Sequence, residues 1–163
     1  EGEAIGEPLF RAGGFLETIA AGPGIARRVC LQRSLAGEEG NAVGAPGGRG
    51  VDVTAEDVFA LASAGNVVAL SVVRDAVRYI GMSVANLISM LNPEVVVLGG
   101  GIGCHLGRYL EGIHDVIRRT AQPQAMTEAR VVTSALGDDG GIIGSAKGIL
   151  DSVSLLGGDG LAR

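Results

Sequence analysis

The chain is poor in aromatic residues and has no tryptophan at all. Only 3% of its 163 residues are aromatic, although 47% are apolar. The apolar share is ordinary for a folded protein and argues against a disordered chain. A chain of this length fits one domain, because a single core commonly serves about 100–200 residues. Its core must therefore be built from valine, isoleucine, leucine and alanine.

Cysteine and concentrated positive charge are also scarce. Cys30 and Cys104 stand far apart, and neither belongs to a CxxC pair. This argues against a disulfide framework or a thiolate zinc site and favours a reducing cytoplasm. The formal charge is −5, with no basic run beyond Arg27–Arg28. Because a phosphate backbone is bound by a concentrated positive face, nucleic-acid binding by this segment alone is not expected.

Long apolar runs are missing too. No uninterrupted run reaches the roughly 18 residues that suggest a membrane helix. The longest candidate, 67–91, contains Arg74, Asp75 and Arg78 and is predicted to be a buried helix. The sequence begins with Glu1 and shows no signal-peptide pattern. We therefore expect no membrane association, and we expect the chain to be part of a longer protein.

Glycine, in contrast, is abundant. The chain has 28 glycines, well above the usual share of roughly 7%. Many of them lie in two clusters, 99–103 and 137–144, beside apolar runs. This pattern predicts tight turns and close approach of backbone segments.

Hydrophobic spacing predicts several helices. The longest, over 67–91, has apolar residues on several faces, which predicts a central, buried position. Asn92–Pro93 should end it, because the residue before proline avoids helical geometry. The other helices are expected at 15–21, from Pro23 onward, after an N-cap at Thr54, around 106–117, and from about 142.

The apolar β-branched run 95–98 does not alternate with polar residues, which is typical of a strand covered on both faces of a parallel sheet. Residues 130–133 are predicted to form a second buried strand. The order strand, helix, strand, helix implies right-handed parallel crossovers and an α/β fold. Residues 37–50 are predicted to form a mobile loop. The domain is expected over 1–151, followed by a flexible Gly-rich tail at 152–163.

Both glycine clusters follow predicted strands, and in open α/β sheets ligands bind beyond the carboxyl ends of the strands. Gly99, Gly100 and Gly101 have no side chains, so a flat ring or a ribose could lie directly on their backbone. The helix that follows would direct its first amides toward a phosphate. The alternative is that these glycines serve only a tight turn. The cluster is no dinucleotide fingerprint, since that spacing meets Cys104 or Leu106 where glycine is required.

Other polar residues have ordinary structural explanations. Asp138 and Asp139 are predicted to cap the final helix, and the alternative is contact with a metal or a ribose hydroxyl. His105 and His114 are interpreted as surface or packing residues. Glu17, taken alone, is a first-turn helix residue. No serine, cysteine or lysine has an evident base partner, so no catalytic residue is predicted.

Three stretches, in order, resemble the ROK family, which contains bacterial sugar kinases and sugar-responsive repressors. The first is similar to the family's GCLE-containing helix and the SGPAIAR-like stretch after it. The next resembles the family's long helix, LNPE turn and glycine-ended strand, and it is quite specific. The last is similar to an LGDDAGLIGAA-like end. They read GGFLETIAAGPGIAR at 13–27, GMSVANLISMLNPEVVVLGGG at 81–101 and LGDDGGIIGSA at 136–146.

The resemblance implies part of the C-terminal lobe of an actin-like ATPase (ribonuclease H-like) fold, with two or more parallel strands packed with long helices. It implies ATP-dependent phosphorylation of a hexose with Mg²⁺ and a homo-oligomer. It also implies that Glu17 binds sugar hydroxyls, with Glu7, at the position of the family's Gly-His histidine, as a second sugar-binding candidate. The nucleotide would lie across Gly99, Gly100, Gly101 and Ile102.

The family's zinc motif is missing from the sequence. Gly6–Glu7 stands in place of Gly-His, and Phe15 replaces the last cysteine of the zinc cluster, so no zinc is predicted. The family's N-terminal lobe, with its phosphate loop and base aspartate, has no counterpart in these residues. Three interpretations stay open: part of a glucokinase-like sugar kinase, the sugar-sensing part of a repressor, or a non-catalytic relative. Nucleic acid would be a partner only through an upstream helix-turn-helix.

Overall fold

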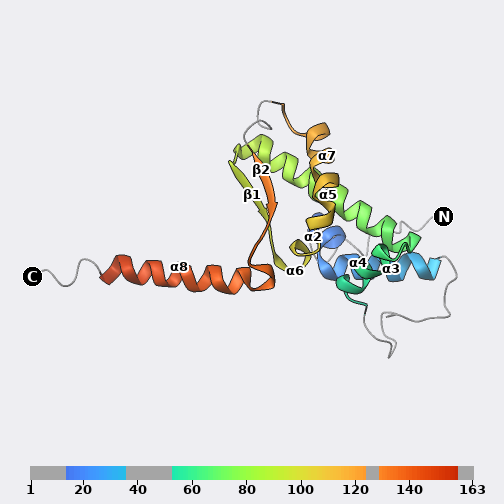
Figure 1. Ribbon diagram of the computed structural model, residues 1–163, viewed down its shortest axis with the longest axis horizontal. Coiled ribbons are helices and arrows are strands. Elements are labelled where there is room, and N and C mark those ends of the chain that lie inside the picture. Colours follow the sequence, from blue (N-terminus) through green and yellow to red (C-terminus); the bar gives the residue numbers. More distant parts are fainter. Residues whose placement is uncertain (1–13, 36–52, 124–128, 158–163) are drawn as a thin grey trace, which may run out of the picture.

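The computed structural model describes residues 14–35, 53–123 and 129–157, so the predicted loop at 37–50 lies outside the described residues. Helices come first, and a strand–helix–strand–helix unit follows (Figure 1). The helices of the first part are α2 (Phe15–Ala20), α3 (Gly22–Leu35), α4 (Ala55–Ser63) and α5 (Val67–Leu91). The second part consists of β1 (Val95–Leu98), α6 (Gly100–Gly103), the 3₁₀ turn η1 (Gly107–Tyr109), α7 (Leu110–Thr120), β2 (Arg130–Thr133), the 3₁₀ turn η3 (Gly137–Asp139) and α8 (Gly140–Gly157).

The two strands form a parallel pair without a shift in register. Val95 lies opposite Arg130, and Leu98 lies opposite Thr133. The ladder extends one residue further, because the Ser134 backbone N–H donates to the Leu98 carbonyl at 2.8 Å. Both strands and their parallel direction are therefore as the sequence predicted, and the carboxyl ends of the strands lie level with each other.

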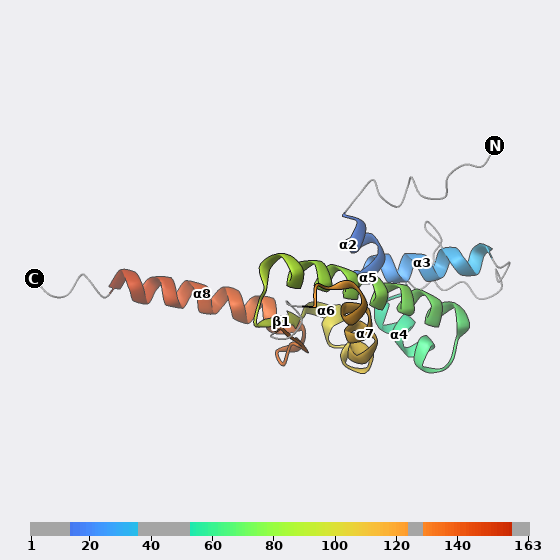
Figure 2. The same cartoon turned by 90° about the horizontal axis from the view of Figure 1, so that it is seen from above.

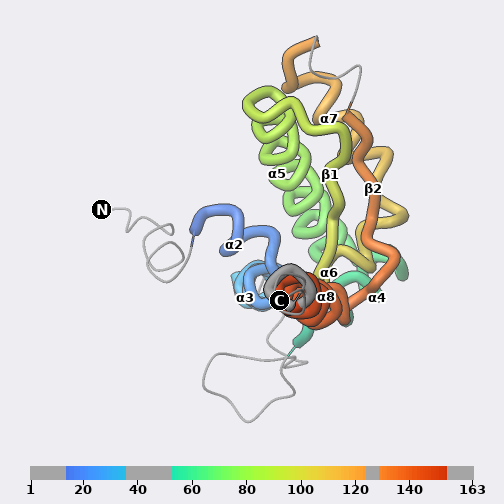
Figure 3. Tube along the Cα trace, turned by 90° about the vertical axis from the view of Figure 1, so that its left-hand side faces the viewer, coloured from blue at the N-terminus to red at the C-terminus, as the bar shows by residue number. Residues whose placement is uncertain are grey.

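The prediction that both faces of the strands are covered is wrong. Val131 is buried, whereas Val97 and Val132 are 58% and 40% exposed on the other face. Figure 3 shows α5 and α7 on one side of the pair. Among the described residues no element packs on the opposite side. The strand face on that side carries valine side chains and is left uncovered.

Helix α5 carries most of the core, and its ends are set by capping residues. The Asn66 side chain accepts from the Ala69 backbone N–H at 2.9 Å, and Asn92 ends the helix with φ 45°. Both bounds of the helix agree with the sequence prediction. The helix is less enclosed than predicted, because Leu87 and Leu91 are exposed near its end. One face packs in the core, with Ala69, Val72, Val73, Ala76, Val84, Ala85 and Ile88 all buried.

Helix α4 begins with a capping box, in agreement with the predicted N-cap at Thr54. The Asp57 backbone N–H donates to Thr54 Oγ1 at 3.2 Å, and the Thr54 backbone N–H donates to Asp57 Oδ2 at 2.9 Å. The bond from the Thr54 backbone, followed by that from its hydroxyl, holds the pKa of Asp57 below its ordinary value. The box satisfies two amides that a helix start leaves without partners.

Helices α2 and α3 form a tight corner. The Ala21 backbone N–H donates to the Glu17 carbonyl at 3.1 Å, and the Ile25 N–H donates to the Ala21 carbonyl at 2.9 Å. A Cβ on Gly24 would lie 2.1 Å from the Thr18 carbonyl oxygen, so only glycine fits there. One turn further along α3, Arg28 forms an ion pair with Asp75 of α5 at 2.5 Å. The corner is thereby held against the core.

Helix α8 leaves the body of the molecule and extends away from it (Figure 2). It continues to Gly157 and so includes residues 152–157, the first part of the segment that the sequence analysis assigned to a flexible tail. Its large apolar side chains are exposed: Ile142, Ile143, Ile149, Leu150 and Val153. They recur at intervals that place them on one stripe of the helix, which is the pattern of a helix that packs against another surface.

No single helix in the described ranges is long and apolar enough to cross a membrane. Helices α4 and α5 meet the length and composition only when taken together, and the pair is bent by 114°. Both helices contribute buried residues to the shared core, including Val58 and Val73. Their apolar character is explained by that packing.

Helices α5 and α7 come very close to each other at Gly81. A Cβ at this position would lie 2.7 Å from Val116 Cβ and 3.3 Å from the Ile113 carbonyl oxygen. Neither atom is the far end of a flexible side chain. The close helix packing therefore depends on the missing side chain.

We predict that Gly81→Ala lowers the free energy of unfolding. The strain of forced packing, about 1–3 kcal/mol, should exceed the gain in helix propensity of about 1 kcal/mol. The matched control is Gly112→Ala in α7, where the new Cβ would lie 3.4 Å from Val77 Cγ1. Urea unfolding should show a lower midpoint for the first variant and an equal or higher one for the second. Equal gains in both variants would contradict the proposed close contact.

Candidate functional site

Two glycine-containing turns meet at the carboxyl ends of the strands. Gly99 and α6 follow β1, and Ser134 and η3 follow β2. A Cβ on Gly99 would lie 3.5 Å from Ser134 Cβ, and one on Gly101 would lie 3.8 Å from Asp138 Oδ1. The two turns therefore pack side by side, at the edge of the sheet where α/β proteins bind ligands.

The glycines of the first turn are required for two different reasons. Gly100 has φ +75°, a conformation that side-chain-bearing residues rarely adopt, and nothing lies within 4 Å of its missing Cβ. A Cβ on Gly103 would lie 2.8 Å from the Leu98 carbonyl oxygen, so the end of α6 must pass close to the strand. Gly99, Gly100 and Gly101 are all exposed. The turn thus presents bare backbone toward open space.

A hydrogen bond joins the two turns. The Cys104 thiol donates to Asp138 Oδ1 at 3.3 Å across 34 positions of the sequence. The bond to this carboxylate is the main reason why the pKa of Cys104 is raised above its ordinary value, with burial and the negative charge adding to it. The thiol therefore stays protonated and acts as a donor, and it is not an activated nucleophile.

Asp138 and Asp139 lie within η3, the 3₁₀ turn that leads directly into α8, so they stand before the final helix as the sequence predicted. Asp138 places its carboxylate against the Cys104 thiol. Two exposed carboxylates therefore border the glycine turn.

Both histidines have packing roles, as predicted. The His105 ring stacks on Phe59, with ring centroids 5.0 Å apart and planes 13° from parallel. His114 Nε2 lies 3.3 Å from the Val131 carbonyl oxygen. The first contact joins α4 to the segment that follows α6, and the second joins α7 to β2.

Glu17 lies in the first turn of α2 and is exposed. The corner that follows it reaches the glycine turn, because a Cβ on Gly22 would lie 3.8 Å from Ile102 Cδ1. The structure thus brings the α2–α3 corner next to Ile102 of α6. Glu7, the second sugar-binding candidate, lies outside the described residues.

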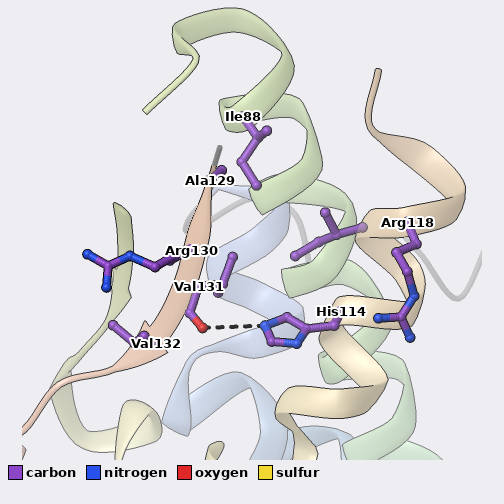
Figure 4. Close-up of a pocket in the computed structure, with 8 residues that line it drawn as sticks. Ile88, His114, Arg118, Ala129, Arg130, Val131 and Val132 are labelled. Carbon is purple, nitrogen blue, oxygen red and sulfur yellow. Dashed lines mark hydrogen bonds between the residues drawn. The ribbon is translucent and has the colours of Figure 1, made fainter. Parts of the chain in front are cut away.

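A cavity of about 480 Å³ lies elsewhere, between α5, α7 and the start of β2 (Figure 4). No signal in the sequence points to it, because its lining comes from three separate elements. Its histidine is bound to the Val131 backbone, and its Arg118 is paired with Asp115. In Figure 4 the Arg130 side chain extends away from His114. The cavity lies toward the amino ends of the strands, and we place the candidate site at the glycine turns instead.

Metal-binding groups are limited in the described part of the chain. No group of three or more histidine, cysteine, aspartate or glutamate side chains could hold an ion there. No disulfide joins Cys30 and Cys104. The absence of zinc stays a prediction from the sequence.

Comparison with known proteins relates the chain to sugar kinases and to a regulator. The model of the ROK family matches residues 12–151. A glucokinase of Halalkalibacterium halodurans is 37% identical over 131 residues, which cover 80% of this chain and 39% of that enzyme. The chain thus spans about two fifths of the length of this relative.

Two solved structures extend the comparison. A ROK family glucokinase from Streptomyces griseus, in complex with glucose and AMPPNP, is 26% identical with a TM-score of 0.64, covering 83% of this chain and 44% of that one. A ROK family transcriptional regulator, a homolog of the E. coli MLC protein, is 26% identical with a TM-score of 0.57, covering 74% of this chain and 29% of that one. The α/β fold predicted from the sequence, that of the actin-like ATPases, is confirmed.

We predict that Asp138→Asn makes Cys104 more reactive. An amide neither carries the negative charge nor accepts as strongly from the thiol, so the pKa of Cys104 should fall toward its ordinary value and the thiolate fraction should rise. In a Cys30→Ser background, alkylation by iodoacetamide at pH 8 should become several-fold faster. Asp139→Asn is the matched control and should leave the rate unchanged. An unaltered rate in Asp138→Asn would disprove the contact between the turns.

Proposed function

The chain belongs to the ROK family, and we propose that it forms part of an ATP-dependent hexose kinase, to which it contributes the nucleotide surface and part of the sugar site. The observation that carries this proposal is the pair of adjoining turns beyond β1 and β2. One turn offers bare glycine backbone, and the other offers two carboxylates. A nucleoside has a flat ring and ribose hydroxyls, which suit these two surfaces.

Charge decides which end of the nucleotide faces which turn. A phosphate placed directly against Asp138 and Asp139 would be repelled, whereas ribose hydroxyls can donate to carboxylates. We therefore assign the ring and ribose to Gly99, Gly100 and Gly101, with Ile102 at the border and the ribose toward η3. Mg²⁺ commonly keeps several waters and is shared with substrate phosphates, so binding of MgATP needs no dedicated protein cage.

The sugar side of the proposal assigns Glu17, and Glu7, to hexose hydroxyls. Glu17 is an exposed carboxylate on α2, a helix that Gly24 and the core hold in a fixed corner. Phosphoryl transfer depends on positioning two substrates and on stabilising the transferred group. The part that we assign to this chain is positioning. The glucose and AMPPNP held by the Streptomyces griseus enzyme support both ligand classes.

A second candidate function is supported by the structural likeness to the ROK family transcriptional regulator. In that case the same sugar site would report on sugar without phosphorylating it, and nucleic acid would be bound elsewhere in the protein. A coupled ATP assay over a panel of hexoses separates the two functions, because only a kinase forms ADP in a sugar-dependent way. For either function we place the protein in the cytoplasm as a homo-oligomer.

We predict opposite selectivity for two variants of the kinase. Gly100→Val puts a branched side chain on the nucleotide surface and should raise KM for ATP about tenfold or more, which corresponds to roughly 1.4 kcal/mol. Glu17→Gln removes a charged acceptor, worth about 1.5–3 kcal/mol, and should raise KM for the sugar while sparing KM for ATP. Steady-state kinetics with each substrate varied in turn measures both effects.

Matched controls separate binding from backbone strain and from helix stability. Gly65 has φ +87° and nothing within 4 Å of its missing Cβ, so Gly65→Val carries the same kind of strain as Gly100→Val in a different turn, between α4 and α5. Glu111→Gln changes a first-turn acid of α7 in the same way as Glu17→Gln changes that of α2. Both controls should keep wild-type KM values. A normal KM for ATP in Gly100→Val would remove the nucleotide assignment.

A further inference from the structure

The proposed sugar and nucleotide residues lie on segments that touch. Glu17 is on α2, whereas the nucleotide turn begins at Gly99, which lies 82 positions further along the chain (99 minus 17). Figure 1 and Figure 3 both show the corner of α2 and α3 next to α6. Given the proposed function, on which the coupling described here rests, a contact between these segments is a contact between two ligand sites.

Ile102 makes the contact from the side of the nucleotide turn. Within 99–103 it is flanked on both sides by glycines, so it is the one residue there with a side chain to reach a neighbour. Its Cδ1 lies 3.8 Å from the point where a Cβ on Gly22 would be, which is an ordinary van der Waals distance. Ala55 of α4 borders the same point at 3.7 Å. Ile102 is half-buried and packs against the core.

The corner can transmit a displacement because it is compact. The Glu17 carbonyl accepts from Ala21 N–H, which directly precedes Gly22. The missing side chain of Gly24 brings α3 against the Thr18 carbonyl. A shift of α2 therefore moves Gly22 with it. The glycine turn is held on its far side by the bond from Cys104 to Asp138, but its glycines are costly to order, since glycine loses more conformational freedom on ordering than any other residue.

We propose that Ile102 is a positioning residue that couples the two sites, so that sugar binding at α2 strengthens nucleotide binding at the glycine turn. Sugar fixes the corner, Gly22 and Ala55 then hold Ile102, and Ile102 orders the turn on which the nucleotide lies. The reverse effect follows with the same factor, because coupling between two binding sites is reciprocal. Because the coupling passes through one side chain, a single substitution at Ile102 should abolish it.

The test is a binding cycle on the full protein by isothermal titration calorimetry. The dissociation constant of AMPPNP with Mg²⁺ is measured without glucose and with saturating glucose, and the ratio of the two constants is the coupling factor. The wild type should show a factor of about fivefold or more, within the usual range of such couplings. Ile102→Ala should bring the factor close to one. Any direct loss of nucleotide affinity in this variant cancels in the ratio.

Two further variants distinguish coupling from general damage. Ile80→Ala removes the same atoms from another half-buried isoleucine of the core and should keep the wild-type factor. Gly22→Ala adds a methyl at ordinary contact distance from Ile102 and should keep or increase it. An unchanged factor in Ile102→Ala, or a factor of one in a wild type that binds both ligands, would overturn the inference. A wild type that binds neither ligand would refute the proposed function itself.

Discussion

The unshifted parallel pairing of β1 and β2 sets the positions of the two turns that form the candidate site. Because Leu98 lies opposite Thr133, the segments that leave the two strands start at the same level and meet. The bond from Cys104 to Asp138 and the short spacing between Gly99 and Ser134 both follow from that arrangement. The pairing in turn depends on α5 and α7, whose close packing at Gly81 supports one face of the strands.

Local signals in the sequence predicted the elements well. The end of α5 was predicted because Asn92–Pro93 stops a helix, and Asn92 is its C-cap in the structure. The strands were predicted because short β-branched runs between glycine turns have few other structures open to them. The glycine cluster at 99–103 was recognised for the same reason. The positive φ of Gly100 then explains why glycine is needed at one of these positions.

Predictions that depended on distant partners were less successful. Asp138 stands where a helix cap is expected, and nothing in its neighbourhood announces that a thiol 34 positions away takes its carboxylate. The proximity of Ile102 to Gly22 could likewise not be predicted from the sequence, because it joins two turns that only the folded core brings together. The prediction of burial failed for a third reason. Val97 and Ile149 belong to apolar runs, yet their exposure depends on which surfaces pack against them in the folded protein.

Amide chemical-shift mapping by NMR can show whether a nucleotide lies on the two adjoining turns. On addition of AMPPNP with Mg²⁺ to the ¹⁵N-labelled protein, we expect the largest shifts at Gly99, Gly100, Gly101 and Ile102 and at Gly137–Gly140. Smaller shifts should extend to Gly22 through its contact with Ile102. Shifts centred instead on the cavity beside His114, or an absence of shifts at both turns under saturating nucleotide, would show that the nucleotide does not bind there.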